Sequence, residues 1–255
     1  MFKTEFNAVC QAAAAKKAFF ENNPLGYFVA SMVAGMFISF GSFIAMCIGG
    51  FMTAAGSDLT KFFVSFTFAA ALSLVVMAGC ELFTGNNFVL GAGAIKKTIS
   101  WMDAIKIWIF CYIGNFVGSW ILVGIFQLTN ICGNEAIASF FASTAASKMG
   151  YAPLEQFTRG ILCNICVCLA VWCGTKLKSE SGKLIMIIWC ILIFMICGFD
   201  HSIANMSILG VGLLNPMDQV LTVSSYFSDL LFVTLGNMVG GIVFVALPYA
   251  IIAKD

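Results

Sequence analysis

Charged residues are scarce in this chain, and so is histidine. Only 10% of the 255 residues are charged and 61% are hydrophobic, with a mean hydropathy of +0.98, whereas a soluble domain has roughly 25% charged residues. This composition excludes a water-soluble globular domain and indicates an integral membrane protein. The net charge of +1 gives no reason to expect nucleic acid as a partner.

The marks of a redox enzyme or a metal centre are also missing. The single histidine, His201, cannot supply paired axial imidazoles to a haem, and no Rossmann fingerprint is apparent. The eleven cysteines lie mostly in apolar stretches, where a thiol behaves as a small hydrophobe. Cys163, Cys166 and Cys168 would share one helix that has no second ligand pair. We therefore expect no cofactor, no metal, no disulfide framework and no enzymatic activity.

What the sequence does contain is a series of apolar stretches long enough to cross a bilayer. An apolar run of about 20 residues spans the hydrocarbon core as a helix. The second and fifth runs are broken and continue as short apolar pieces. We predict an all-α bundle with six crossings, at 25–52, 61–79 with 88–95, 104–128, 157–175, 184–199 with 203–211, and 227–253.

The two breaks share one pattern. Residues 79–87 and 198–206 both read Gly-x-acid-x4-Asn, with Glu81 and Asp200 as the acids. Glycine and polar residues at membrane depth are tolerated only where the backbone is buried in protein or lines a cavity. Paired broken helices in two halves of a chain mark a transport site. The pattern predicts a channel or transporter.

A second match supports an internal repeat. Residues 114–118 and 236–240 both read Gly-Asn-x-Val-Gly, in the third and sixth runs, at nearly the offset that separates the breaks. Three crossings are an odd number, so the repeats, at about 25–128 and 157–253, must enter the membrane in opposite senses. The fold would be aquaporin-like, with one channel domain over 1–255 and with the breaks meeting near the midplane.

The distribution of basic residues predicts the orientation. With six crossings, all of the thirteen Lys and Arg residues except Lys61, Lys148 and Arg159 lie on one side of the membrane. This bias places both termini in the cytoplasm.

The N-terminal segment reads as a helix on the membrane surface. Residues 1–22 lack the continuous apolar core of a signal peptide. Phe2, Phe6, Val9 and Ala13 would fall on one helical face. We expect a cytoplasmic interfacial helix rather than a cleaved leader.

Longer motifs resemble those of a known family. Residues 198–206, the segment 81–84, and Arg159-Gly160-x3-Asn164 followed by Val171-Trp172 resemble signatures of the formate/nitrite transporter family, and most closely those of its hydrosulfide-channel branch. Formate channels generally have Glu where Asp200 stands. The resemblance implies a homopentamer in a bacterial inner membrane, in which each protomer has its own pore. Hydrosulfide would be the favoured anion, and formate and nitrite would also be possible.

The same resemblance implies roles for particular residues. His201, Thr84 and Asn164 would form the polar centre of the pore, with Lys148 at the outer mouth and Lys16 at the inner one. Apolar constrictions would flank that centre, formed by Leu82, Phe83, Val167 and Phe194, together with Phe68, Leu72 and Ala204.

Each polar residue also has a structural interpretation. Placing an ionisable residue at membrane depth costs on the order of 2.5–3.5 kcal/mol of free energy or more. We therefore expect His201 to line the pore, and the alternative is that it packs between helices as a neutral imidazole. Thr84 and Asn164 could bond only to neighbouring backbone. Glu81 and Asp200 could relay protons, but we favour a structural role at the breaks, with Asp200 as a helix N-cap.

Asn86 and Asn205, which end the two break motifs, are expected to have the same structural role. Half-helices that begin at the midplane direct their N-terminal N–H groups at the pore centre and favour anions. Desolvation favours a neutral imidazole that donates a hydrogen bond until an anion arrives. An aquaporin-like pore for neutral solutes is disfavoured, because neither break contains Asn-Pro-Ala.

Overall fold

The computed structural model describes residues 1–254, and helices make up most of them. The elements, in chain order, are α1 (Lys3–Asn22), α2 (Pro24–Ala54), α3 (Thr60–Thr67), α4 (Ala69–Leu74), the π-helical turn η1 (Val75–Gly79), α5 (Phe83–Ile95), α6 (Trp101–Leu128), the 3-10 turn η2 (Ile131–Gly133), α7 (Glu135–Met149), α8 (Pro153–Lys176), α9 (Glu180–Cys197), α10 (Ser202–Leu214), α11 (Val223–Gly241), the π-helical turn η3 (Ile242–Ala246) and α12 (Leu247–Ile252).

The prediction of an all-α bundle with six crossings and two broken spans is confirmed. Within the described residues, six helical segments are long and apolar enough to cross a membrane: Pro24–Ala54, Thr60–Gly79, Trp101–Leu128, Pro153–Lys176, Glu180–Cys197 and Val223–Ile252. The second and fifth of these end at the predicted breaks, and the half-helices α5 and α10 follow them.

One half-helix begins earlier than predicted. Hydropathy places its start at residue 88, whereas α5 begins at Phe83 and includes Thr84, Asn86 and Asn87. These polar side chains are buried inside the bundle. Thr84 and Asn86 have hydrogen-bond partners there, so polarity at these positions does not mark the end of the helix.

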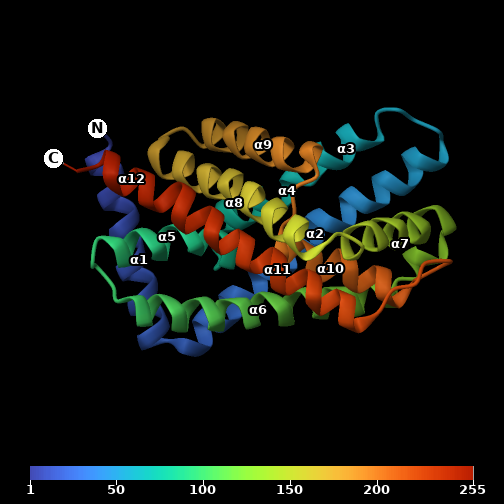
Figure 1. Ribbon diagram of the computed structural model, residues 1–255, viewed down its shortest axis with the longest axis horizontal. Coiled ribbons are helices and arrows are strands. Elements are labelled where there is room, and N and C mark those ends of the chain that lie inside the picture. Colours follow the sequence, from blue (N-terminus) through green and yellow to red (C-terminus); the bar gives the residue numbers. More distant parts are fainter. Residues whose placement is uncertain (255) are drawn as a thin grey trace.

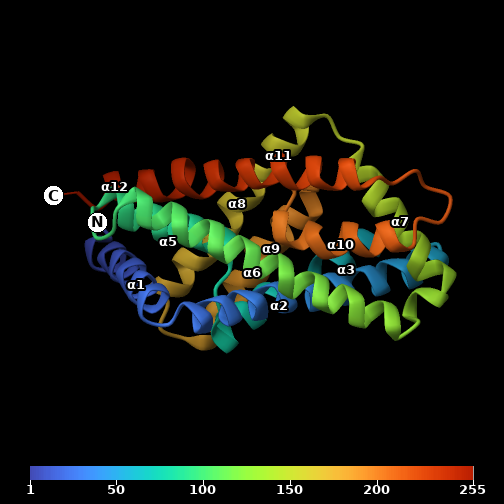
Figure 2. The ribbon, with the colours of Figure 1, turned by 90° about the horizontal axis from the view of Figure 1, so that it is seen from below.

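The half-helices extend in opposite directions from the middle of the bundle (Figures 1 and 2). Both termini lie at one end of the long axis, here called the terminal end, and α7 lies at the other, here called the α7 end. α5 runs from the middle toward the terminal end and α10 toward the α7 end. The two breaks thus come together between the ends.

Equivalent elements of the two halves are built alike. Gly79 and Gly198, which open the breaks, have φ values of 77° and 76°, a conformation that favours glycine. α2 packs along α6 as α8 packs along α11, and these are the two most extensive helix pairs. A Cβ atom at Gly118 or Gly240 would collide with a backbone oxygen of the facing helix. The Gly-Asn-x-Val-Gly segments are therefore sites of close helix approach.

A short helix precedes each half. α1 precedes α2, and its residues Phe6, Val9 and Ala13 are buried, mainly against α5. The face predicted to lie at the membrane surface is thus covered by protein. Sequence analysis assigned no helix to residues 135–149, where α7 precedes α8.

Candidate functional site

His201 lies at the start of α10, between the two parts of the fifth span, and is only 4% exposed. Its Nδ1 accepts a hydrogen bond from the Ala204 N–H at 3.1 Å. Because a backbone amide can only donate, the neutral ring must carry its proton on Nε2. Nε2 lies 2.9 Å from the Thr84 hydroxyl, so in this tautomer the imidazole donates and the Thr84 oxygen accepts.

Thr84 comes from the opposite half of the molecule, in the first turn of α5. Since its oxygen accepts from His201, the Thr84 hydroxyl hydrogen remains available, and it has no acceptor within residues 1–254. The two breaks thus meet through one hydrogen bond that joins the halves. This contact leaves a free O–H donor at the centre of the bundle.

Asn164 is adjacent to this pair but is used differently. Its Nδ2 donates to the Thr84 carbonyl at 3.2 Å and to the Asn237 carbonyl at 2.6 Å. The Oδ1 atom is buried and has no partner among the described residues. In this arrangement Asn164 has no amide hydrogen left for a bound molecule, and it links α8 to α5 and α11.

Two other asparagines cap the half-helices. Asn115 Oδ1 accepts the Phe83 N–H and Asn237 Oδ1 accepts the Ser202 N–H, each at 2.9 Å. The amide of each asparagine donates to the carbonyl of the acid in its own break, at 2.9 and 3.0 Å. These are the asparagines of the repeated Gly-Asn-x-Val-Gly segments, whose role as caps was not predicted.

The first break contains a closed polar cluster. Lys16 Nζ lies 2.6 and 2.7 Å from the two oxygens of Glu81. The Tyr27 hydroxyl and Asn86 Nδ2 also donate to Glu81, at 2.8 and 3.0 Å. One carboxylate therefore meets one ammonium group, and both of its oxygens are bonded. Glu81 is held by side chains rather than by the backbone of its own turn.

The second break contains a cluster with two acids. Lys148 of α7 pairs with Asp200, which is 0% exposed. Asn205 Nδ2 donates to Asp200 at 3.4 Å and to Asp229 of α11 at 2.8 Å. The carboxylate of Asp200 is directed at these side chains, so the predicted backbone N-cap is wrong, and Asn237 and His201 provide the caps of α10.

A cavity of about 240 Å³ connects this region to the α7 end. His201 lines it, together with Phe194, Ala204 and the two lysines Lys61 and Lys148. The ring of Phe194 lies nearly parallel to the imidazole, with centroids 6.2 Å apart. We call this cavity the vestibule.

The predicted constriction residues are buried at different places. Phe68 meets Phe194 edge-on at 6.0 Å, beside the vestibule. Leu72, Leu82 and Val167 are buried in the core.

Phe83 lies on another side of α5, because its ring packs against Tyr112 of α6 at 5.0 Å. The narrowing of a pore by Phe83 and by the other predicted constriction residues remains a prediction.

The three basic residues that the charge pattern separates from the rest gather around the second break. Lys61 and Lys148 line the vestibule. Arg159 donates to the Gly198 carbonyl at 2.7 Å, and its guanidinium lies over the Tyr151 ring. Lys148 is paired with Asp200, whereas Lys61 has no ion pair within residues 1–254.

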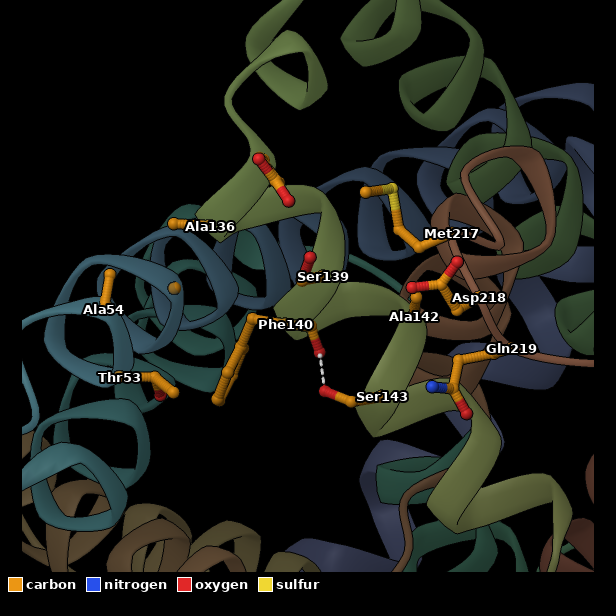
Figure 3. Close-up of a pocket in the computed structure, with 12 residues that line it drawn as sticks. Thr53, Ala54, Ala136, Ser139, Phe140, Ala142, Ser143, Met217, Asp218 and Gln219 are labelled. Atoms are coloured by element: carbon orange, nitrogen blue, oxygen red, sulfur yellow. Dashed lines mark hydrogen bonds between the residues drawn. The ribbon is translucent and has the colours of Figure 1, made fainter.

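A second hollow of about 570 Å³ lies at the outermost part of the α7 end. Figure 3 shows Ser139, Phe140 and Ser143 of α7 on one side of it, and Asp218 and Gln219 of the loop between α10 and α11 on another. None of the central polar residues lines this hollow, which adjoins the vestibule at Phe140.

The cysteines form no metal site among the described residues. All eleven are free, and no group of three or more His, Cys, Asp or Glu side chains in residues 1–254 could hold a metal ion.

Asp229 and Tyr27 are site residues that sequence analysis missed. Asp229 had a readable signal, because it is a lone acid inside the predicted span 227–253. Tyr27 had none, since a tyrosine near a membrane interface is ordinary.

The six spans, the paired breaks and the buried polar centre define a membrane channel or transporter rather than an enzyme. The formate/nitrite transporter family model matches residues 3–251. The chain therefore belongs to the formate/nitrite transporter family.

Relatives match nearly the whole chain. The uncharacterized transporter YwcJ of Bacillus subtilis is 34% identical over 96% of both chains. The nitrite transporter NirC of Escherichia coli is 33% identical over 98% of this chain and 91% of its own.

Solved structures also match. One described as an FNT family ion channel superimposes with a TM-score of 0.91 at 30% identity, covering 99% of each chain. A pentameric formate channel with formate bound gives a TM-score of 0.77 at 29% identity, covering 93% of this chain and 98% of that one.

Proposed function

We propose that this protein is a channel for small monovalent anions, with hydrosulfide as its main substrate and formate and nitrite as further ones. The observation that carries the proposal is the contact between His201 and Thr84 near the vestibule. The imidazole donates to Thr84 and leaves the Thr84 O–H free as a donor inside the bundle. An anion that enters from the vestibule without its water would regain part of its hydration shell from this hydroxyl, and from the imidazole N–H if that group turns from Thr84 to the anion.

Three further features favour an anion over a cation. Lys61, which has no ion pair within residues 1–254, lines the approach. The N-termini of α5 and α10 meet near the centre, where their dipoles favour negative charge. Apolar side chains such as Phe194 and Ala204 leave little room beside the imidazole, so large solutes would not fit.

The chemistry of the anion explains why hydrosulfide comes first. In our proposal an anion at His201 favours protonation of the imidazole by water. The anion then either leaves as an ion or takes that proton, which returns the imidazole to its neutral form, and crosses the remaining apolar region as a neutral weak acid. Hydrogen sulfide is a much weaker acid than formic or nitrous acid, so hydrosulfide takes a proton more readily. The alternative is a formate or nitrite channel, or a proton-coupled transporter, with the same site.

Flux measurements in liposomes would rank these substrates. We expect hydrosulfide to move faster than formate and nitrite under equal gradients, and chloride to move slowest. Replacing His201 with Asn should keep a donor and the fold but change the pH dependence and the order of anions. Unchanged rates, order and pH profile in a correctly assembled His201→Asn protein would contradict the role given to this histidine.

We further propose a homopentamer in a bacterial cytoplasmic membrane, with the terminal end in the cytoplasm. The lysine bias and the pentameric relative support this arrangement. On a cysteine-depleted background, impermeant thiol labels should reach position 148 only from outside and positions 97 and 178 only from inside. Labelling of 97 and 148 from one side would contradict the orientation.

A further inference from the structure

Asp229 is a buried carboxylate to which the proposed conduction path assigns no role. It is 0% exposed, on the buried face of α11. One oxygen accepts from Asn205 at 2.8 Å, and the other has no partner among the described residues. An ionised carboxylate in such a place is costly unless a cation or several donors compensate for it.

The neighbouring groups do not supply that compensation. Lys148 from α7 is the cation of the cluster, and it pairs with Asp200. α6 contributes the phenol of Tyr112, and α11 itself contributes the phenol of Tyr226. From α8, Arg159 directs its guanidinium at the Gly198 carbonyl and at Tyr151. Two carboxylates therefore share one ammonium group.

The buried oxygens without hydrogen bonds also indicate an excess of negative charge. Asp200 Oδ2, Asn205 Oδ1 and Asp229 Oδ2 are all buried and without partners within residues 1–254. These atoms accept hydrogen bonds when the acids are ionised, and nothing nearby donates to them. A single added proton on a carboxylate would both remove the excess charge and provide a missing donor.

The first half of the molecule has no such excess. Glu81 meets Lys16, Tyr27 and Asn86, so that one acid faces one base. Ile107 stands as far before Asn115 as Asp229 stands before Asn237, and it is a buried hydrophobic residue. The second acid is thus an addition to the half that contains the vestibule.

We propose that Asp229 is a proton-binding site that sets the charge at the vestibule and so controls the passage of anions. A proton from water at the α7 end binds a carboxylate oxygen, and no other bond changes. With the proton bound, the cluster of Lys148, Asp200 and Asp229 is neutral. Without it, the cluster carries one negative charge and repels anions. Asn205, which lines the vestibule and bonds both acids, connects the cluster to that water.

This inference rests on the proposed anion conduction, so its test includes a readout that needs no transport. Infrared difference spectra of the purified protein after a drop in pH should show a protonated carboxyl band that is absent in the Asp229→Asn variant. The amide keeps an oxygen for Asn205 and removes only the titration. The same band in both proteins would overturn the proposal. If the wild-type protein shows the band and the variant lacks it, but the wild type conducts no anion, the proposed function would be refuted and the proton site would stand.

Formate flux provides the second readout, because formate stays ionised while the pH at the α7 end is varied. Wild-type flux should rise as that side is acidified. Asp229→Asn should remove this rise and exceed wild type roughly tenfold at the alkaline end, as expected for one charge near the path. The rise should also persist in the His201→Asn protein, although at a shifted pH, which separates the effect of Asp229 from that of His201. A wild-type pH profile in Asp229→Asn would overturn the proposal.

Asp218→Asn is the matched control, because Asp218 is an acid at the α7 end that lines the hollow of Figure 3 and does not line the vestibule. It should keep the wild-type profile. Asp229→Glu keeps a carboxyl group and should shift the profile without removing it, which preserves the test if the Asn variant does not fold. An unshifted profile in that variant would contradict the proposal. A wild-type flux that depends on sodium rather than on protons would indicate a bound metal cation and overturn it too.

Discussion

Asn115 in the first half and Asn237 in the second make the same three hydrogen bonds, whereas the residues after the two acids differ. Leu82 follows Glu81, and His201 follows Asp200. Each asparagine accepts from the first N–H of a half-helix and donates to two carbonyls, one in the break and one on the facing helix. The halves therefore share the frame, by which we mean the hydrogen bonds of Asn115 and Asn237 that hold the breaks, and they differ in the side chains that follow the two acids.

The chemistry of the proposed pathway comes from the residues that break this equivalence. Counted from the two acids, Thr84 corresponds to Ile203, yet it bonds to His201 of the other half. A site at the meeting point of two inverted halves can therefore take one group from each. The shared residues keep the breaks in place, and the unshared ones determine what passes.

The largest expected effect concerns the shared frame. Replacing Asn237 with Leu removes three buried hydrogen bonds and leaves backbone groups unsatisfied, at roughly 1–3 kcal/mol each. Asn115→Leu should be equally damaging. We expect both variants to lose most folded protein, measured by size-exclusion chromatography and thermal unfolding in detergent.

The exposed Asn22 provides the control, since Asn22→Leu breaks no buried contact. Severe loss in only one of the two buried variants would show that the two caps are not equivalent.

The second effect compares the ion pairs. Lys148→Gln leaves two buried acids without a cation, and breaking a buried pair costs about 3–5 kcal/mol. Lys16→Gln leaves Glu81 with Tyr27 and Asn86 and should cost less. Melting temperatures of the two variants at neutral pH would check this order. Equal decreases in melting temperature would mean that the second half has no more uncompensated carboxylate charge than the first.

Much of this frame was predictable from sequence. Apolar length gave the six spans, and the repeated Gly-x-acid-x4-Asn pattern gave both breaks. The placing of His201 and Thr84 together at a polar centre rested on family resemblance, because hydropathy does not distinguish pore-lining residues from packed ones, and their hydrogen bond was not predicted.

Other features depend on tertiary structure. Lys16 and Glu81 are far apart in the sequence and meet because α1 folds back on α5. α7 was missed because residues 135–149 show neither a long apolar run nor the break pattern. The prediction that Asp200 caps α10 was wrong because Lys148, from that unpredicted helix, binds the carboxylate.

A third effect tests the contact between the halves. Thr84→Val keeps the shape but removes the hydroxyl, so the imidazole loses its acceptor and the anion loses a donor. We expect flux to fall by roughly tenfold, which corresponds to one lost hydrogen bond of about 1.4 kcal/mol. Thr84→Ser keeps the hydroxyl and should retain most activity in the same liposome assay. A fall of equal size in Thr84→Ser would assign the effect to packing.

The smallest expected effect lies at the vestibule mouth. Lys61 is exposed, lines the vestibule and has no ion pair within the described residues, so its charge attracts anions only through water. Such an interaction is worth about 1 kcal/mol or less and is screened over about 10 Å at 0.1 M salt. Lys61→Gln should therefore lower anion uptake from the α7 end by roughly twofold in dilute buffer, and the difference should vanish at high salt. Lys178→Gln, at the terminal end, should not change uptake from the α7 end at either salt concentration. A defect in Lys61→Gln that persists at high salt would show that this lysine acts through direct contact rather than through its field.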